Sequence, residues 1–258
     1  MSKFFVPANS PEDWKPLLAE PDKHWKTGYS AKSLAYRWQG ADDFPDCVRT
    51  VFNSSGIKLF QNMKLLVGFP EYKVPLPGGI RASQSDIFLL AKGNNQLASI
   101  TVEGKVSETF GPTIEEWITD YGKGKEKRLK YLCGVLGLEE GIMTHIRYQL
   151  VHRTASAVIE AKEFNAHTAM MLVHSFSSEN QGFEDYKDFL NLFNIKGEID
   201  RLLFAKNIDG IDLFFCWVKD NLNFALRPGT SFLEELVAAE EKYGALAGKL
   251  AKLPPQKP

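Results

Sequence analysis

Two apolar runs separated by polar turn residues form the clearest pattern in the chain. Ile87–Ala91 and Leu97–Val106 are rich in residues that favour strands, and Asn94 and Asn95 lie between them. Asparagine accepts the positive φ that two-residue hairpin turns require. The pattern therefore predicts an antiparallel β-hairpin with its turn at Asn94 and Asn95.

The two faces of this hairpin differ in polarity. Because side chains alternate between faces, pairing outward from the turn gives one wholly apolar face: Ile87 with Val102, Leu89 with Ile100, and Ala91 with Ala98. On the other face, Asp86 lies opposite Glu103, ahead of Phe88–Thr101 and Leu90–Ser99. Opposed carboxylates about 5 Å apart repel each other. A hard divalent cation neutralises such a pair through oxygen ligands.

Lys105 extends the polar end of this face. It follows Glu103 by two residues, so it projects from the same side of the strand. Asp86 followed by Glu103-Gly104-Lys105 resembles the D…(D/E)-x-K signature of the PD-(D/E)XK phosphodiesterase superfamily, with bacterial members as the nearest type. Ser85 stands where that family has a proline.

The predicted order of elements resembles the same superfamily. The middle of the chain reads as helix, three strands, helix and strand, over 45–54, 60–70, 86–91, 97–106, 142–162 and 169–176. This αβββαβ order is the superfamily's common core. The resemblance implies an α/β fold, a mixed central sheet flanked by helices.

The remaining segments are predicted as additions to one domain spanning 1–258. Residues 1–58 read as a helical N-terminal part and 59–176 as the nuclease-like core. The C-terminal addition, 177–253, comprises a helix, a hairpin and a helix, and 254–258 a loose tail. In the addition, the hairpin strands are Leu202–Lys206 and Ile211–Lys219, with Asp-Gly at the turn, and the last helix is Ser231–Leu253.

The resemblance implies metal-assisted hydrolysis of a phosphodiester. Asp86 and Glu103 are expected to hold one or two Mg²⁺ ions, with Mn²⁺ as a substitute and the Gly104 carbonyl as a further ligand. Lys105 would orient the attacking water and stabilise charge that grows on the phosphate. Gly104 suits a strand position where a side chain would crowd the metal, and it equally suits a simple packing gap.

Three further residues are supporting candidates. Gln149 and Arg153 interrupt the apolar stripe of the helix predicted over Ile142–Lys162, and a buried polar side chain needs a partner. They either serve the site or form an internal ion pair. Glu71, near the end of the preceding strand, is either a third carboxylate or a surface residue beside Lys73.

Two basic segments are candidates for nucleic-acid binding. Trp25 and Lys26 belong to a loop that interleaves cations with aromatic residues, a composition that suits stacking on bases and pairing with phosphates. The alternative is that the aromatic side chains fill the core while the lysines are solvated. The most basic segment contains Lys123, Lys125, Lys127, Arg128 and Lys130, which suit either phosphate contacts or a solvated helix start.

Composition limits the function classes. The net charge of −1 argues against a dedicated nucleic-acid coat protein but permits a localised basic groove. The three cysteines are scattered singly, as expected of reduced thiols in a cytoplasmic protein. We expect no signal peptide, and no apolar stretch is long enough to span a membrane. The expected partner is nucleic acid, DNA in preference to RNA, and the resemblance to duplex-cutting enzymes allows a homodimer.

Other chemistries fit the sequence less well. A glycosidase also uses two carboxylates but does not need the lysine two residues on. The chain contains no HExxH zinc motif and no GxSxG nucleophile motif. Two alternatives to an active phosphodiesterase stay open. One is a nuclease-like fold that binds nucleic acid or protein without cutting, and the other is a structural pairing of Lys105 with Glu103.

Overall fold

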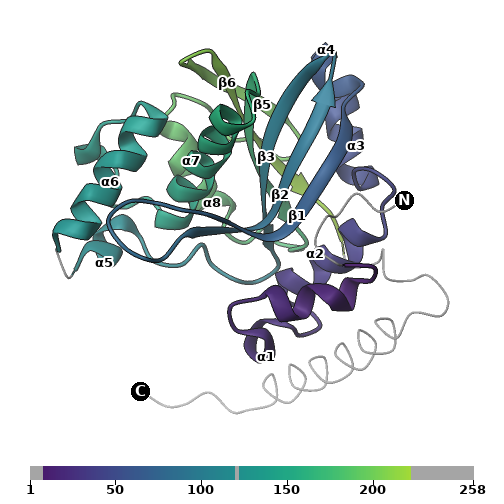
Figure 1. Ribbon diagram of the computed structural model, residues 1–258, viewed down its shortest axis with the longest axis horizontal. Helices are drawn as coiled ribbons and strands as arrows, with labels where there is room; N and C mark the ends of the chain where they lie inside the picture. The colour runs from purple at the N-terminus through teal and green to yellow at the C-terminus, as the bar shows by residue number, and fades with distance from the viewer. Residues whose placement is uncertain (1–7, 120–121, 222–258) are drawn as a thin grey trace, which may run out of the picture.

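A single mixed sheet organises the part of the chain that the computed structural model describes, residues 8–119 and 122–221 (Figure 1). Its strand order is β1-β2-β3-β4-β6-β5. The first three strands form an antiparallel meander, β4 runs parallel to both β3 and β6, and β5 returns antiparallel to β6. The strands are β1 (Lys64–Val74), β2 (Ser83–Gly93), β3 (Gln96–Lys105), β4 (Thr168–Ser175), β5 (Leu202–Ile208) and β6 (Ile211–Lys219).

Helices cover both faces of the sheet, which confirms the predicted α/β class. One face carries α5 (Ile114–Ile118), α6 (Lys123–Leu136), the short 3₁₀ helix η2 (Glu140–Ile142), α7 (Tyr148–Glu163) and α8 (Phe183–Asn191). The opposite face carries α2 (Ser30–Gln39), α3 (Asp46–Ser54) and α4 (Lys58–Gln61). The chain reaches α2 through the 3₁₀ helix η1 (Pro11–Leu17) and α1 (Pro21–His24).

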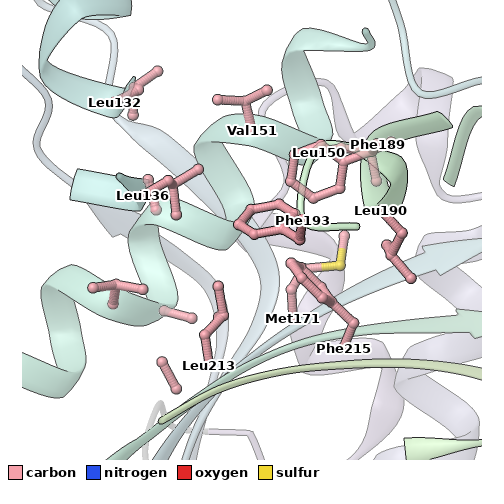
Figure 2. Packing of buried hydrophobic residues seen from close by; sticks show 14 of the residues in the cluster. Leu132, Leu136, Leu150, Val151, Met171, Phe189, Leu190, Phe193, Leu213 and Phe215 are labelled. Atoms are coloured by element: carbon pink, nitrogen blue, oxygen red, sulfur yellow. The ribbon is translucent and has the colours of Figure 1, made fainter. Parts of the chain in front are cut away.

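The larger of the two hydrophobic cores lies between the sheet and α6, α7 and α8. Figure 2 shows Leu150 from α7 and Phe189 from α8 packed near Met171 and Phe215 of the sheet. All four side chains are fully buried. Each such burial stabilises the fold by about 1.5–3 kcal/mol. Every residue of the central strand β4 is buried, as expected when helices cover both faces of a parallel strand.

The predicted hairpin is confirmed in turn and register. Asn94 and Asn95 have φ values of 48° and 61°, and the strands pair from Gly93–Gln96 outward to Ile87–Val102. The apolar face packs in the core with α2, α3 and α4. The polar face meets α7, where the Thr101 hydroxyl donates to the Arg153 carbonyl at 3.1 Å. The hairpin thus presents its polar side chains to α7.

Several element boundaries differ from the sequence prediction, and two of the differences change how the core is built. The first strand begins at Lys64, not at Phe60, because the apolar residues before it form α4 and bury Phe60 in the core. The long helix begins at Tyr148, not at Ile142, because the chain first makes η2 and a turn in which Arg147 bridges to Thr113.

The predicted C-terminal hairpin is present, and it completes the sheet rather than standing apart from it, since β6 pairs with β4. The helix predicted over Ser231–Leu253 and the tail Pro254–Pro258 lie outside the described residues. Among the described helices, none has both the length and the apolar character needed to cross a bilayer.

Candidate functional site

The three residues of the D…E-x-K pattern line one cavity. Asp86 lies near the start of β2, and Glu103 and Lys105 lie at the end of β3. The cavity has a volume of about 530 Å³. Glu103 is 3% exposed and Lys105 is 4% exposed, and the Lys105 ammonium donates to Glu103 Oε1 at 2.9 Å. Alternation along the paired strands therefore brings these side chains together as the sequence predicted.

Glu103 is held by three donors. The Gln149 amide donates to its Oε1 at 2.6 Å, beside the bond from Lys105, and Arg153 Nε donates to its Oε2 at 2.8 Å. Lys105 also donates to the side-chain amide oxygen of Gln149, Oε1, at 3.1 Å. Burial by itself would raise the pKa of Glu103, but the charges of Lys105 and Arg153 lower it below the ordinary value. Glu103 is therefore an ionised carboxylate with both oxygens engaged.

Asp86 has a different electrostatic setting. Its Oδ2 accepts a hydrogen bond from the Gly104 backbone N–H at 2.8 Å, which ties it across the hairpin to β3. Burial, and then the negative charge of Glu103, raise the pKa of Asp86 to about 7. The nearby positive charges therefore compensate Asp86 less than they compensate Glu103.

Glu71 belongs to the same cavity and is not a surface residue beside Lys73. Its neighbours Pro70 and Tyr72 pair with Ile87 and Ser85, the two neighbours of Asp86, so Glu71 and Asp86 occupy matching positions on adjacent strands. Its backbone has a positive φ of 53°. Burial, and then repulsion from Asp86, raise the pKa of Glu71 to about 8.

The cavity carries carboxylate oxygens, the type of ligand that a hard divalent cation takes. Glu71 Oε2 accepts from the Gln84 amide at 2.7 Å, and Asp86 Oδ2 accepts from Gly104. The other oxygen of each carboxylate, Oε1 and Oδ1, accepts no hydrogen bond from the described residues. Burial and mutual repulsion account for the raised pKa values of both carboxylates. Mg²⁺ and Mn²⁺ take such oxygen ligands.

Gly104 is explained by packing. A Cβ built there would approach the Leu34 side chain of α2 closer than 3.0 Å and would lie 3.2 Å from Ser30 Cβ. The missing side chain therefore makes room for α2 on the face opposite the carboxylates. The packing-gap interpretation is the one that the structure supports. The role of the Gly104 carbonyl as a metal ligand stays a prediction.

Residues 18–31, which we call the N-terminal roof, form a second part of the cavity wall. Its lining residues are Leu18, Ala19, Lys23, His24, Lys26, Tyr29, Ser30 and Ala31. Figure 1 shows α1 and α2 at one end of the sheet. Of the lining residues in the roof, the sequence had singled out Lys26 alone. Lys23, His24 and Tyr29 belong to the same loop of cations and aromatic residues, and that composition was the signal that could have found them.

The chain matches one protein family, whose description gives no function. The family model described as "Domain of unknown function (DUF6946)" matches residues 7–222. The chain belongs to this family. No curated protein and no solved structure matches the chain. The matched residues include the whole carboxylate cavity and the N-terminal roof.

Trp25, the other predicted contact in the roof loop, faces a different hollow. Its indole N–H donates to Glu12 Oε2 at 3.0 Å, and the side chain lines a hollow of about 560 Å³ together with Lys26. Trp25 also packs in part against the core beneath α2. The core-filling interpretation is supported in part, and the contact of Trp25 with nucleic acid stays a prediction.

The basic segment of the DUF6946 chain lies on α6, outside the lining of the carboxylate cavity. Arg128 is 8% exposed and donates to the carbonyls of Leu76, Pro77 and Gly79. The expected phosphate contact from Arg128 is therefore corrected, because its guanidinium anchors the loop between β1 and β2. Lys125 donates to the Trp117 carbonyl at 2.7 Å. The other three predicted contacts are exposed on α6: Lys123, Lys127 and Lys130.

A second polar cluster has ligand types that suit a transition metal but hydrogen bonds that do not. One potential ligand atom from each of Cys47, His174 and Asp220 lies within 4.8 Å of the others. However, the Trp38 indole N–H donates to His174 Nδ1 at 2.9 Å, so a neutral His174 carries its proton on Nε2. That N–H meets Asp220 Oδ2 at 3.1 Å and leaves Nε2 no lone pair for a metal. The cluster is therefore a structural hydrogen-bond network.

Burial sets the charge states in this network. It lowers the pKa of His174, against the opposing effect of Asp220, and it raises the pKa of the Cys47 thiol to about 12. Arg37 Nε donates to Asp220 Oδ2 at 2.7 Å. A neutral thiol and a neutral imidazole therefore surround an Arg37–Asp220 ion pair.

Proposed function

We propose that this chain is a metal-dependent phosphodiesterase that hydrolyses nucleic acid, with a site of the PD-(D/E)XK type. The observation that carries the proposal is the convergence of Asp86, Glu103 and Lys105 in one cavity on the polar face of the β2–β3 hairpin. The element order supports it. A helix (α3), the three antiparallel strands β1–β3, the helix α7 and the parallel strand β4 follow one another, with α5, α6 and η2 inserted before α7.

The carboxylates would hold the cation. Asp86 and Glu71 each offer an oxygen that is not engaged, and Glu103 adds a charged carboxylate beside them. A bound Mg²⁺ or Mn²⁺ supplies Lewis-acid polarisation of the phosphate and a water of lowered pKa. A bound cation would also offset the burial and the mutual repulsion that raise the pKa values of Asp86 and Glu71.

Lys105 would bind the reacting phosphate. Its ammonium lies 2.9 Å from Glu103 Oε1 and 4.5 Å from the centre of the Phe110 ring. These contacts, with the bond to Gln149, keep a cation at the carboxylate end of the cavity. A preorganised cation stabilises the negative charge that develops on phosphate oxygens in the transition state. Gln149 and Arg153 act as positioning residues, because they orient Lys105 and Glu103.

The test is a cleavage and metal-binding assay on purified full-length protein. Wild type with Mg²⁺ or Mn²⁺ is expected to cleave DNA or RNA, and Asp86→Asn and Lys105→Ala are each expected to lose at least about a hundredfold of that activity. Circular dichroism and thermal unfolding check that the variants stay folded. Calorimetry with Mn²⁺ is expected to show a site that Asp86→Asn removes. Folded wild type that binds no Mn²⁺ up to millimolar concentration and cleaves nothing would refute the proposal.

A second candidate function is a nuclease-like fold that binds nucleic acid or protein without cutting. One observation favours it: Lys105, Gln149 and Arg153 already satisfy both oxygens of Glu103. A carboxylate so well neutralised gains less from a cation than an unpaired one does. Nucleic-acid binding that persists in a chelator, with no Mn²⁺ site and no cleavage, would select this candidate.

A further inference from the structure

The N-terminal roof gives the carboxylate cavity a cationic and aromatic wall. Lys23, His24, Lys26 and Tyr29 line the same cavity as the carboxylates. Tyr29 is 38% exposed, and the Lys26 ammonium lies 5.9 Å from the centre of its ring. A cation beside an accessible aromatic face suits a nucleotide, which offers a phosphate and a base together.

The roof is fixed to the strand that carries the site. One oxygen of the Glu108 carboxylate accepts the Ser30 N–H at 2.7 Å, and the other accepts the Val106 N–H at 2.9 Å. Glu108 therefore joins the start of α2 to the end of β3. The close packing of Leu34 on Gly104 makes a second connection between these two elements. These contacts hold the start of α2 in place beside the cavity.

A second hollow lies beside the first and shares Lys26 with it. This hollow has a volume of about 560 Å³, and its described lining residues are Glu12, Lys15, Trp25, Lys26, Thr27, Lys32 and Tyr36. Lys32 is 6% exposed, with its ammonium 5.8 Å from the centre of the Tyr36 ring. Glu12 accepts hydrogen bonds from both Trp25 and Tyr36. The described lining holds three lysines and one carboxylate, and Lys15 also lies 3.7 Å from Asp22 Oδ1. This composition suits an anionic ligand.

We propose that the two hollows form one track for a single strand of nucleic acid, so that the substrate class is single-stranded nucleic acid or a frayed strand end. This inference rests on the proposed function. The carboxylate cavity takes the scissile phosphate, and the hollow around Lys15, Lys26 and Lys32 takes the flanking nucleotides. Cations that follow the backbone, combined with aromatic side chains, are the usual means of binding a single strand without reading its sequence.

The cavity has the size of a site for a single nucleotide. A volume of about 530 Å³ is that of a site for one small molecule, and it accommodates a nucleotide. A duplex is a rigid rod in which every nucleotide is paired and stacked. An unpaired strand can bend into the cavity.

The binding test uses full-length Asp86→Asn protein in a chelator, so that cleavage plays no part. The probe is a fluorescently labelled oligothymidine, free or annealed to oligoadenosine, followed by anisotropy. The free strand is expected to bind at least about tenfold more tightly than the duplex. Added Lys26→Glu should weaken strand binding about tenfold and reduce its salt dependence. The matched control, Lys196→Glu at an exposed position that lines neither hollow, should stay within about twofold.

The outcomes separate this inference from the proposed hydrolysis. Equal binding of strand and duplex, or equal losses in the Lys26→Glu and Lys196→Glu proteins, would overturn the track. A wild-type protein with Mg²⁺ that cuts the duplex faster than the strand would overturn it while hydrolysis stands. Strand binding that depends on Lys26, without cleavage of either probe, supports the track and rejects hydrolysis.

Discussion

Gly104 on β3 lies directly beneath Leu34 of α2, so close that a Cβ at position 104 would approach the Leu34 side chain within 3.0 Å. Leu34 is fully buried, so a shift of its side chain would disturb the packing around it. The same strand carries Glu103 and Lys105 on its opposite face. One glycine therefore couples the placement of the N-terminal helices to the face that forms the site.

Replacing Gly104 by alanine is expected to destabilise the protein by about 1–3 kcal/mol, the usual cost of overpacking a core. Urea unfolding measures the change. The control is Gly134→Ala, because Gly134 lies on α6 with no atom near its would-be Cβ. Alanine favours a helix by up to about 1 kcal/mol, so the control should be neutral or stabilising. A Gly104→Ala protein as stable as wild type would contradict the packing explanation.

Arg153→Met is expected to cost about 3–5 kcal/mol of stability, because it removes one partner from a buried carboxylate. Arg153 Nε donates to Glu103 Oε2 at 2.8 Å, and both side chains are buried. Adding Glu103→Gln to Arg153→Met should recover a large part of the loss, since the unpaired charge is then gone. Chemical denaturation of the two single variants and the double variant measures the coupling. Additive losses would mean that the pair is not coupled.

In metal-free protein, the contribution of the carboxylate cavity to stability is expected to fall as the pH rises from about 4 to about 8. The pKa of Glu71 rises from 4.5 to about 8 on folding, and that of Asp86 rises from 3.8 to about 7. Over this range the folded state binds more protons than the unfolded state, so deprotonation favours unfolding. Glu71→Gln should stabilise the protein at pH 8 by on the order of 1–3 kcal/mol.

The control for the pH experiment is Glu139→Gln, an exposed carboxylate outside the cavity. Its thermal unfolding should follow wild type at each pH. Added Mn²⁺ should raise the wild-type Tm more at pH 8 than at pH 6, because cation binding competes with protons on Glu71 and Asp86. The pKa values of His152 and His174 are lowered by burial, so these residues add stability as the pH rises and oppose the carboxylates. A stability difference between Glu71→Gln and wild type that does not grow from about pH 5 to about pH 8 would therefore contradict the raised pKa of Glu71.

Asp220→Ala is expected to cost about 1–3 kcal/mol, because Arg37, Cys47 and His174 each lose a hydrogen bond to its carboxylate. Mn²⁺ binding should be unchanged, since the His174 cluster has no lone pair to offer a metal. Cys47→Ser keeps a hydroxyl donor toward Asp220 and should change stability by less than about 1 kcal/mol. Calorimetry and thermal unfolding of both variants provide the readouts. Loss of a Mn²⁺ site in Asp220→Ala would overturn the structural assignment of this cluster.

Local pattern was sufficient to predict the hairpin that carries the candidate site. Strand alternation and the Asn94–Asn95 turn determine which side chains share a face, and both depend only on residues close in sequence. The same reasoning placed Asp86, Glu103 and Lys105 together. It left Glu71 ambiguous, because its relation to Asp86 depends on the register of β1 against β2 across a long loop. It also left Arg128 with two interpretations, which the β1–β2 loop carbonyls decide.

The sequence by itself determined the α/β class, the order of the central elements and the polar face on which Asp86 and Glu103 meet, because these follow from short-range periodicity and turn chemistry. Only the tertiary structure decided that Gln149 and Arg153 engage Glu103, that Glu71 joins the cavity and that residues 18–31 roof it. Those contacts join segments far apart along the chain. Their pairing is set by how helices and strands pack in space, which no local spacing of residues records.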